Sequence, residues 1–182
     1  AGIDVADVGC GAGHAVNLMA AAFPNSRFVG YDLSEAAIGM ARAEADEMGL
    51  GNASFEVADA AELHAGPFDF ITTFDAVHDQ ARPGDMVAGI AAAMKDDATW
   101  LCVDIAGSSH LQSDLELPMA PFFYATSTLH CMTVSLAYDG DGLGSMWGEE
   151  RARSLFGEAG FRTIDIRKAP GDLFNNYYIC RK

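Results

Sequence analysis

Residues 3–13 have the sequence Ile-Asp-Val-Ala-Asp-Val-Gly-Cys-Gly-Ala-Gly, which joins a short apolar run to a corner rich in glycine. The apolar half is typical of a buried strand, with Asp7 near its end. Residues 14–23 follow without a helix breaker and stop at Pro24, which predicts a helix. Because glycine has no Cβ, it allows a tight turn and lets a ligand approach the main chain closely. The segment therefore predicts a strand, a ligand-binding corner and a helix.

Strand-like and helix-like segments alternate along most of the remaining chain. Further strands are expected at 27–31, 54–58, 68–74, 99–105, 162–168 and 176–181, and further helices at 35–48, 84–95 and 148–159. This alternation predicts an α/β fold with a doubly wound, mostly parallel sheet of seven strands and helices on both faces. Residues 108–147 break the alternation and are expected to form an insertion after the fifth strand.

The charge balance limits the partners that the domain can bind. The net charge is −15, from 11 basic and 26 acidic residues, which argues against a nucleic-acid substrate because phosphate backbones attract basic surfaces. No apolar run approaches the roughly 20 residues that a membrane span needs, and no signal peptide precedes the first strand. We expect a cytoplasmic domain that contacts neither membrane nor nucleic acid.

The cysteines and acidic clusters do not form a recognisable metal motif. No two cysteines make a CxxC pair, and their spacing fits neither a zinc site nor a disulfide framework, the four being Cys10, Cys102, Cys131 and Cys180. Asp75, Asp139 and Asp141 lack the order of ligands of a calcium-binding loop. We therefore predict free cysteines, a reducing compartment and no metal.

The third glycine of the corner distinguishes two classes of nucleotide-binding fold. A dinucleotide-binding loop, Gly-x-Gly-x-x-Gly, would place its third glycine at position 14, where this chain has His14. The observed pattern, acidic-x-Gly-x-Gly-x-Gly from Asp7 to Gly13, resembles motif I of the Rossmann-like (class I) S-adenosylmethionine (SAM)-dependent methyltransferases. That resemblance implies a Rossmann-like sheet with an antiparallel last strand, SAM as cofactor and S-adenosylhomocysteine as product. The alternative interpretation is a tight strand–helix turn without a ligand.

Acidic residues at the ends of the second and third strands strengthen the resemblance. It implies that Asp32 bonds both ribose hydroxyls and that Asp59 receives the adenine amino group, with the backbone N–H of Ala60 next to the ring. The alternatives are that Asp32 only introduces the helix capped by Ser34, and that Asp59 only ends a strand. The implied cofactor-binding residues are Asp7, Gly9, Cys10, Gly11, Gly13, Asp32, Leu33, Asp59, Ala60 and Phe74.

The segment after the fourth strand is expected to approach the transferable methyl group. The resemblance places Phe74 beside the methionine moiety, and His78 four residues later is our candidate general base, because imidazole titrates near neutral pH. The alternative is that His78 only positions the loop before Pro83. Asp75 and Asp79 could orient the imidazole, bind substrate or face water. We expect structural roles for His14, His110 and His130.

The insertion at 108–147 contains apolar and aromatic residues that could cover an acceptor pocket, as segments in this position do in the resembling family. The alternative is that they pack a core. The residues concerned are Met119, Phe122, Phe123, Tyr124, Met132 and Met146.

The stretch from Tyr138 to Glu150 resembles a bacterial and archaeal subgroup of these methyltransferases that carries an N-terminal winged-helix domain. This resemblance implies that residues 1–182 are a methyltransferase domain from which the N-terminal part is missing. That part would contribute acceptor-binding residues and a possible homodimer contact.

The sequence thus predicts an enzyme that transfers a methyl group from SAM to a small-molecule acceptor. Two alternatives remain: a non-catalytic SAM-sensing domain of a transcriptional regulator, and an NAD-dependent dehydrogenase, which His14 disfavours.

Overall fold

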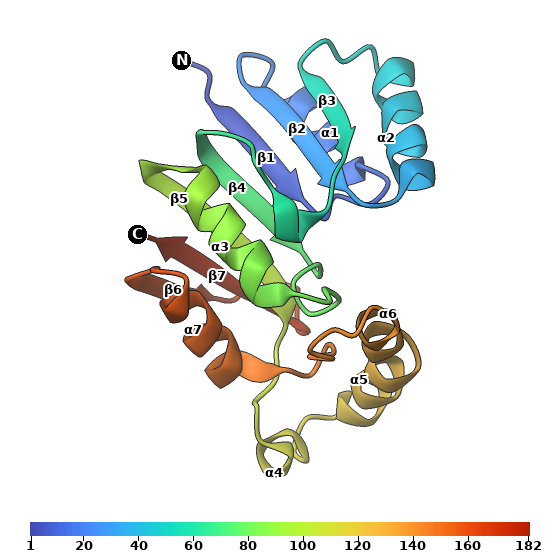
Figure 1. The fold of residues 1–182 in the computed structure, drawn as a ribbon, viewed down its shortest axis with the longest axis vertical. Coiled ribbons are helices and arrows are strands. Elements are labelled where there is room, and N and C mark those ends of the chain that lie inside the picture. The colour runs from blue at the N-terminus through green and yellow to red at the C-terminus, as the bar shows by residue number, and fades with distance from the viewer.

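The computed structural model describes all 182 residues and contains one seven-stranded sheet with the order β3-β2-β1-β4-β5-β7-β6 (Figure 1). β1 to β5 pair in parallel, and β7 pairs antiparallel with both β5 and β6. The strands are β1 (Asp4–Val8), β2 (Arg27–Asp32), β3 (Ala53–Val57), β4 (Phe68–Phe74), β5 (Met94–Ile105), β6 (Thr163–Arg167) and β7 (Asn175–Arg181). The predicted α/β fold, with its mostly parallel sheet and reversed last strand, is confirmed.

Helices cover both faces of the sheet and enclose two hydrophobic cores. On one face, α1 (His14–Ala22) and α2 (Glu35–Glu47) pack their small apolar residues against Val5, Phe28 and Phe55. On the other face, α3 (Pro83–Ala93) and α7 (Gly148–Glu158) form a larger core around Trp100. A short 3₁₀ helix, η1 (Ala60–Glu62), contributes Ala60 to this larger core.

The helix–strand boundary before β5 differs from the prediction. We expected a helix to Lys95 and a strand from Thr99, whereas α3 ends at Ala93 and β5 already begins at Met94. Met94 pairs with Phe68, and a register shift then separates this pair from the pairing of Phe70 with Thr99. The polar residues 95–97 lie in this irregular part of β5, between the two paired positions, and their composition did not indicate a strand.

The predicted insertion after β5 is helical. It contains α4 (Leu111–Asp114), α5 (Ala120–Thr126), a π-helical turn η2 (Ser127–Cys131) and α6 (Met132–Ala137). Figure 1 shows these helices beyond the carboxyl ends of the parallel strands, apart from the helices that cover the sheet. No helix of the protein combines the length and apolar character that crossing a bilayer would require.

The parallel arrangement brings the predicted site residues to the side of the sheet where the parallel strands have their carboxyl ends. The carboxyl ends of β1, β2, β3 and β4 all lie on this side. The corner after β1 therefore lies beside the loops that follow the neighbouring strands. Ligands of open α/β sheets bind in the crevice outside these strand ends. The sheet thus positions a candidate site between the strand ends and the insertion.

Candidate functional site

The glycine-rich corner after β1 is fastened to β2 by its own amides. The N–H groups of Gly9 and Cys10 both donate to the carbonyl oxygen of Tyr31, at 2.8 and 2.9 Å. The Gly11 N–H donates to Oδ2 of Asp32 at 2.8 Å. Because these amides already have partners within the protein, they hold the shape of the corner rather than stand free for a ligand.

All three glycines of the corner have left-handed backbone conformations, and Gly11 and Gly13 differ in what surrounds them. Gly13 has φ +73°, and a Cβ at this position would lie 2.5 Å from the Phe55 ring and from Cβ of Ala41. Gly11 has φ +54°, but a Cβ there would meet nothing within 4 Å. Gly13 therefore allows α1 to pack closely, whereas Gly11 borders open space that a ligand can occupy.

The carboxylates at the ends of β2 and β3 are each anchored by a backbone amide. Oδ1 of Asp32 accepts from the Ser34 N–H at 2.9 Å, and Oδ1 of Asp59 accepts from the Ala61 N–H at 2.8 Å. Oδ2 of Asp59 also accepts from the Arg82 guanidinium at 3.1 Å. A carboxylate oxygen can accept two hydrogen bonds, so both groups keep capacity for a ligand.

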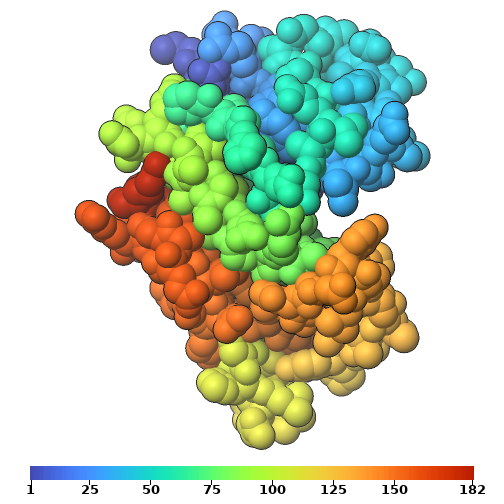
Figure 2. Space-filling model, in the orientation of Figure 1, coloured from blue at the N-terminus to red at the C-terminus, as the bar shows by residue number.

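A cavity of about 400 Å³ lies between these carboxylates and the insertion. In Figure 2 the surface is hollowed between the blue and teal N-terminal segments and the orange end of the insertion. Five predicted cofactor-binding residues line the cavity: Gly9, Asp32, Leu33, Asp59 and Ala60. Its other lining residues are Ala58, Ala61, Asp79, Gln80, Ala81, Arg82, Val134 and Tyr138.

The other five predicted cofactor-binding residues are not among those that line this cavity: Asp7, Cys10, Gly11, Gly13 and Phe74. Asp7 is buried below the corner and accepts a hydrogen bond from Thr72 at 2.7 Å. Burial raises the pKa of its carboxyl group to about 7 despite this hydrogen bond, and the Asp32 charge adds to the rise. Burial and the charges of Asp7 and Asp32 raise the pKa of the Cys10 thiol to about 12, so this cysteine stays protonated.

His78 belongs to a buried polar cluster at the ends of β4 and β5. Its side chain is 4% exposed, and Nδ1 lies 2.7 Å from Oδ1 of Asp104. The Trp147 indole N–H donates to the same oxygen at 3.2 Å, and Oδ2 of Asp104 has no hydrogen-bond partner. On the other side, Nε2 lies 3.3 Å from Oδ1 of Asp79, which lines the cavity. Asp104 thus holds the imidazole by a hydrogen bond, whereas Oδ1 of Asp79 lies near Nε2 without forming one.

The electrostatics of this cluster favour bound protons. Burial opposes the charged imidazole, but Asp104, Asp79 and Asp75 outweigh it and raise the pKa of His78 above 6.5. Burial, and then the charge of Asp104, raise the pKa of Asp75 to about 6. Ligand-type atoms of His78, Asp79 and Cys131 lie within 4.8 Å of one another. A protonated imidazole between carboxylates accounts for the cluster, and the absence of a metal stays a prediction.

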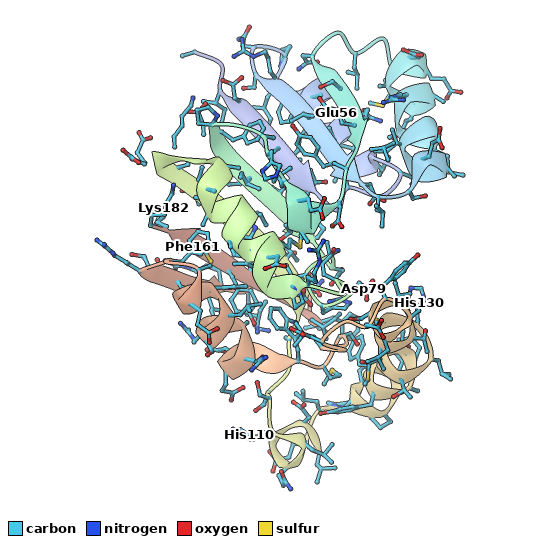
Figure 3. The ribbon with its side chains drawn as sticks, in the orientation of Figure 1. Glu56, Asp79, His110, His130, Phe161 and Lys182 are labelled. Carbon is cyan, nitrogen blue, oxygen red and sulfur yellow. The ribbon has the colours of Figure 1, made fainter.

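The remaining histidines lie away from the cavity lining. His14 pairs with Glu44 on the surface, Nδ1 to Oε1 at 2.7 Å. His110 and His130 are exposed on the insertion, as Figure 3 illustrates. None of these three side chains lines the cavity, and their structural roles stay a prediction.

The aromatic residues of the insertion have several environments. Phe123 lines a separate apolar pocket of about 280 Å³ together with Met119, Phe174 and Leu173. Tyr124 donates to Asp114, and Met146 is buried. The pocket agrees with an apolar cover for an acceptor, whereas Met146 agrees with the alternative of core packing.

Several residues of the site were not predicted. Asp104 lies within an apolar strand, and Trp147 lies 43 residues further along the chain, so no local pattern connects them with His78. Gln80, Ala81 and Arg82 follow the candidate residue Asp79, and their place after a parallel strand is the signal that could have identified them as cavity wall. Tyr138 was noted only as part of a family resemblance.

The hydrogen-bond acceptors and apolar residues around the cavity fit an adenosyl cofactor. Asp32 lies at the wall with acceptor capacity for a pair of adjacent hydroxyls, and Asp59 lies at the wall with acceptor capacity for an amino group. Leu33 and Ala60 add apolar surface, and Gly11 leaves open space at the corner.

The chain is similar to known methyltransferases in sequence. A model of the family described as "Methyltransferase domain" matches residues 1–167. The ubiquinone biosynthesis O-methyltransferase of Aromatoleum aromaticum is 37% identical over 98 residues, which cover 52% of this chain and 41% of that protein. The nocamycin O-methyltransferase of Saccharothrix syringae is 43% identical over 75 residues, which cover 39% and 26%. The chain spans less than half the length of either relative.

Solved structures support the fold. A structure described as a putative O-methyltransferase from Nostoc punctiforme superposes with a TM-score of 0.78 at 19% identity. The superposition covers 98% of this chain and 51% of that one. Because the family model covers most of the sequence and the sheet has the matching Rossmann-like topology, the chain belongs to the methyltransferase domain family.

Proposed function

We propose that this domain transfers a methyl group from SAM to a small-molecule acceptor and leaves S-adenosylhomocysteine. The observation that carries the proposal is the cavity at the strand ends, where Asp32 and Asp59 flank open space next to the glycine corner. When bound, SAM supplies a methyl group that its sulfonium has already activated, so the chief task of the protein is alignment and exclusion of water.

The proposed contacts follow from the chemistry of the two carboxylates. Asp32 would accept hydrogen bonds from the two ribose hydroxyls while the Gly11 and Ser34 amides fix its orientation. Asp59 would accept from the adenine amino group, and its Oδ2 is shared with Arg82. Leu33 and Ala60 would contact the ring, and Phe74, exposed at the end of β4, would lie toward the methionine moiety.

We place the proton acceptor at His78, acting together with Asp79. Asp104 holds Nδ1 of His78, which directs Nε2 toward Asp79. Since only 4% of His78 is exposed, Asp79 at the cavity wall provides the route by which a proton of the acceptor would reach the imidazole. The raised pKa of His78 means that this base works best above pH 6.5.

A hydroxyl is the acceptor group that the comparisons favour. Both curated relatives are named as O-methyltransferases. The apolar pocket around Phe123 and Phe174, beside the end of β5, would suit the hydrophobic body of such an acceptor. We therefore propose an apolar compound that carries a hydroxyl group.

Methyl transfer from isotopically labelled SAM to a panel of phenols and other hydroxyl compounds tests the proposal. We expect labelled product and an equal amount of S-adenosylhomocysteine with at least one acceptor. Binding of SAM without transfer to any member of a broad panel would instead favour the sensing function. Failure to bind SAM would refute both.

A further inference from the structure

The insertion forms one wall of the cofactor cavity, in addition to any part that it has in binding the acceptor. Val134 of α6 and Tyr138, directly after α6, line the cavity together with Asp32 and Asp59, although the sequence associated the insertion with the acceptor alone. In Figure 2 the orange end of the insertion rises beside the hollow. The cavity therefore has a wall contributed by residues more than 100 positions from the glycine corner.

Hydrogen bonds fix this wall to the loop after β4. Ser135 Oγ donates to the Gln80 carbonyl at 2.9 Å, and the Asp141 N–H donates to the Ala81 carbonyl at 2.9 Å. Gly140 lies so close to Ala81 that a Cβ at this position would overlap its backbone. Because Gln80 and Ala81 themselves line the cavity, the end of α6 has a set position relative to it.

The loop after β4 also contacts the buried imidazole and the predicted adenine site. Asp79 approaches His78, and Arg82 donates to Asp59 and to Glu62 at 3.1 and 3.2 Å. Figure 3 shows Asp79 in this loop, on the side of the insertion. The end of α6 is thus bonded to the segment that connects the buried imidazole with the predicted adenine site.

Tyr138 places an aromatic ring at this wall with little protein around it. Its side chain is 71% exposed although it lines the cavity, and its N–H donates to the Ser135 carbonyl. The next residue, Asp139, has φ +53° and turns the chain back toward Ala81. A large aromatic side chain in such a place has one face available for a planar ligand.

We propose that Tyr138, supported by Val134, binds the adenine ring of the cofactor by stacking against it. This inference rests on the proposed function, because it assumes an adenosyl ligand between this wall and the carboxylates. Stacking on an aromatic side chain suits any base, whereas Asp59 reads the amino group, so the two residues contribute affinity and specificity respectively.

Calorimetric titration of the protein with S-adenosylhomocysteine and with adenosine tests the role of Tyr138. Tyr138→Ala is expected to weaken both ligands by the same factor, roughly 5- to 100-fold, as loss of base stacking does. Tyr138→Phe keeps the ring and is expected to bind within about two-fold of the unaltered protein. Leu129→Ala is the control, because Leu129 is 79% exposed on the same insertion but is not part of the cavity lining.

The outcomes separate this inference from the proposed function. If the unaltered protein does not bind S-adenosylhomocysteine, the proposed cofactor itself is wrong. If it binds and Tyr138→Ala binds equally well, or loses S-adenosylhomocysteine but not adenosine, the stacking role is wrong. Thermal unfolding of each variant checks that the fold is retained, which the exposure of Tyr138 leads us to expect.

Discussion

Carboxylates end strands on both sides of β1, but their environments are opposite. On one side Asp32 and Asp59 line an open cavity, each held by a backbone amide two residues further on. On the other side Asp104 is fully buried against His78 and Trp147, and the pKa of Asp75 is raised to about 6. We call these the open carboxylates (Asp32, Asp59) and the buried cluster (His78, Asp104), beside which Asp75 lies exposed.

The difference indicates that the two groups have different functions, one in ligand binding and the other in proton transfer. The open carboxylates keep free acceptor capacity at the cavity wall, which suits the binding of hydroxyl and amino groups. On the other side the pKa values of His78 and Asp75 are both raised, which suits proton transfer. Changes on the first side should therefore affect ligand affinity, and changes on the second side should affect turnover.

Substitution of the buried imidazole has the largest expected effect. We expect His78→Gln to lower kcat by about 10²- to 10⁴-fold, the usual contribution of a general base. Affinity for S-adenosylhomocysteine should change little. The unaltered enzyme should gain activity as the pH rises through a value above 6.5, because the imidazole must lose its proton. Steady-state rates across the pH range measure both effects.

His130→Gln is the control for this substitution, since His130 is exposed on the insertion. An unchanged kcat in His78→Gln, or a loss confined to cofactor affinity, would contradict the claim that the buried side acts in turnover.

The glycine corner allows a test within the open side. Gly13→Ala should lower the free energy of unfolding by about 2–4 kcal/mol, because a methyl group would overlap Phe55 and Ala41 and the backbone is left-handed. Gly11→Ala, with a similar backbone but free space around it, should cost only about 1 kcal/mol. Urea denaturation compares the two variants. Equal losses would mean that close packing is not what requires Gly13.

Asp7, buried between the two sides, gives an effect that depends on pH. Its folded pKa of about 7 exceeds the usual 3.8, so ionisation disfavours the folded state increasingly as the pH rises from about 4 to 7. Asp7→Asn lacks this penalty, so its stability relative to the unaltered protein should rise by about 2–3 kcal/mol between pH 5 and pH 8. Denaturation at both pH values measures the gain, with exposed Asp46→Asn as control. A constant difference would contradict the raised pKa.

The open side could be predicted from the sequence because each of its features is local. The glycine corner directly follows a strand, Asp32 ends one and Asp59 lies two residues after another. The rule that parallel strands end on the same side of the sheet therefore brings them together. The fold followed from the same alternation. The expected boundary of β5 was wrong because the strand begins at Met94, whose pairing with Phe68 of β4 is a tertiary contact that composition does not report.

The buried cluster and the insertion wall could not be predicted in this way. His78, Asp104 and Trp147 come from a loop, a strand and the start of a helix, and only the fold brings them into contact. Tyr138 reaches the cavity because Ser135 and Asp141 bond the loop after β4. Such contacts depend on tertiary packing between distant segments, which spacing along the chain does not report.

Titration calorimetry with S-adenosylhomocysteine, before and after removal of the Asp32 carboxylate, tests the central claim most directly. Asp32→Ala removes the acceptor for both hydroxyls and the anchor of the Gly11 amide, and should weaken binding about 100-fold or more. Asp165→Ala, an exposed strand carboxylate at the far edge of the sheet, should leave binding unchanged. If the unaltered protein does not bind this ligand, or if Asp32→Ala binds it equally well, the adenosyl site that we place at the glycine corner does not exist.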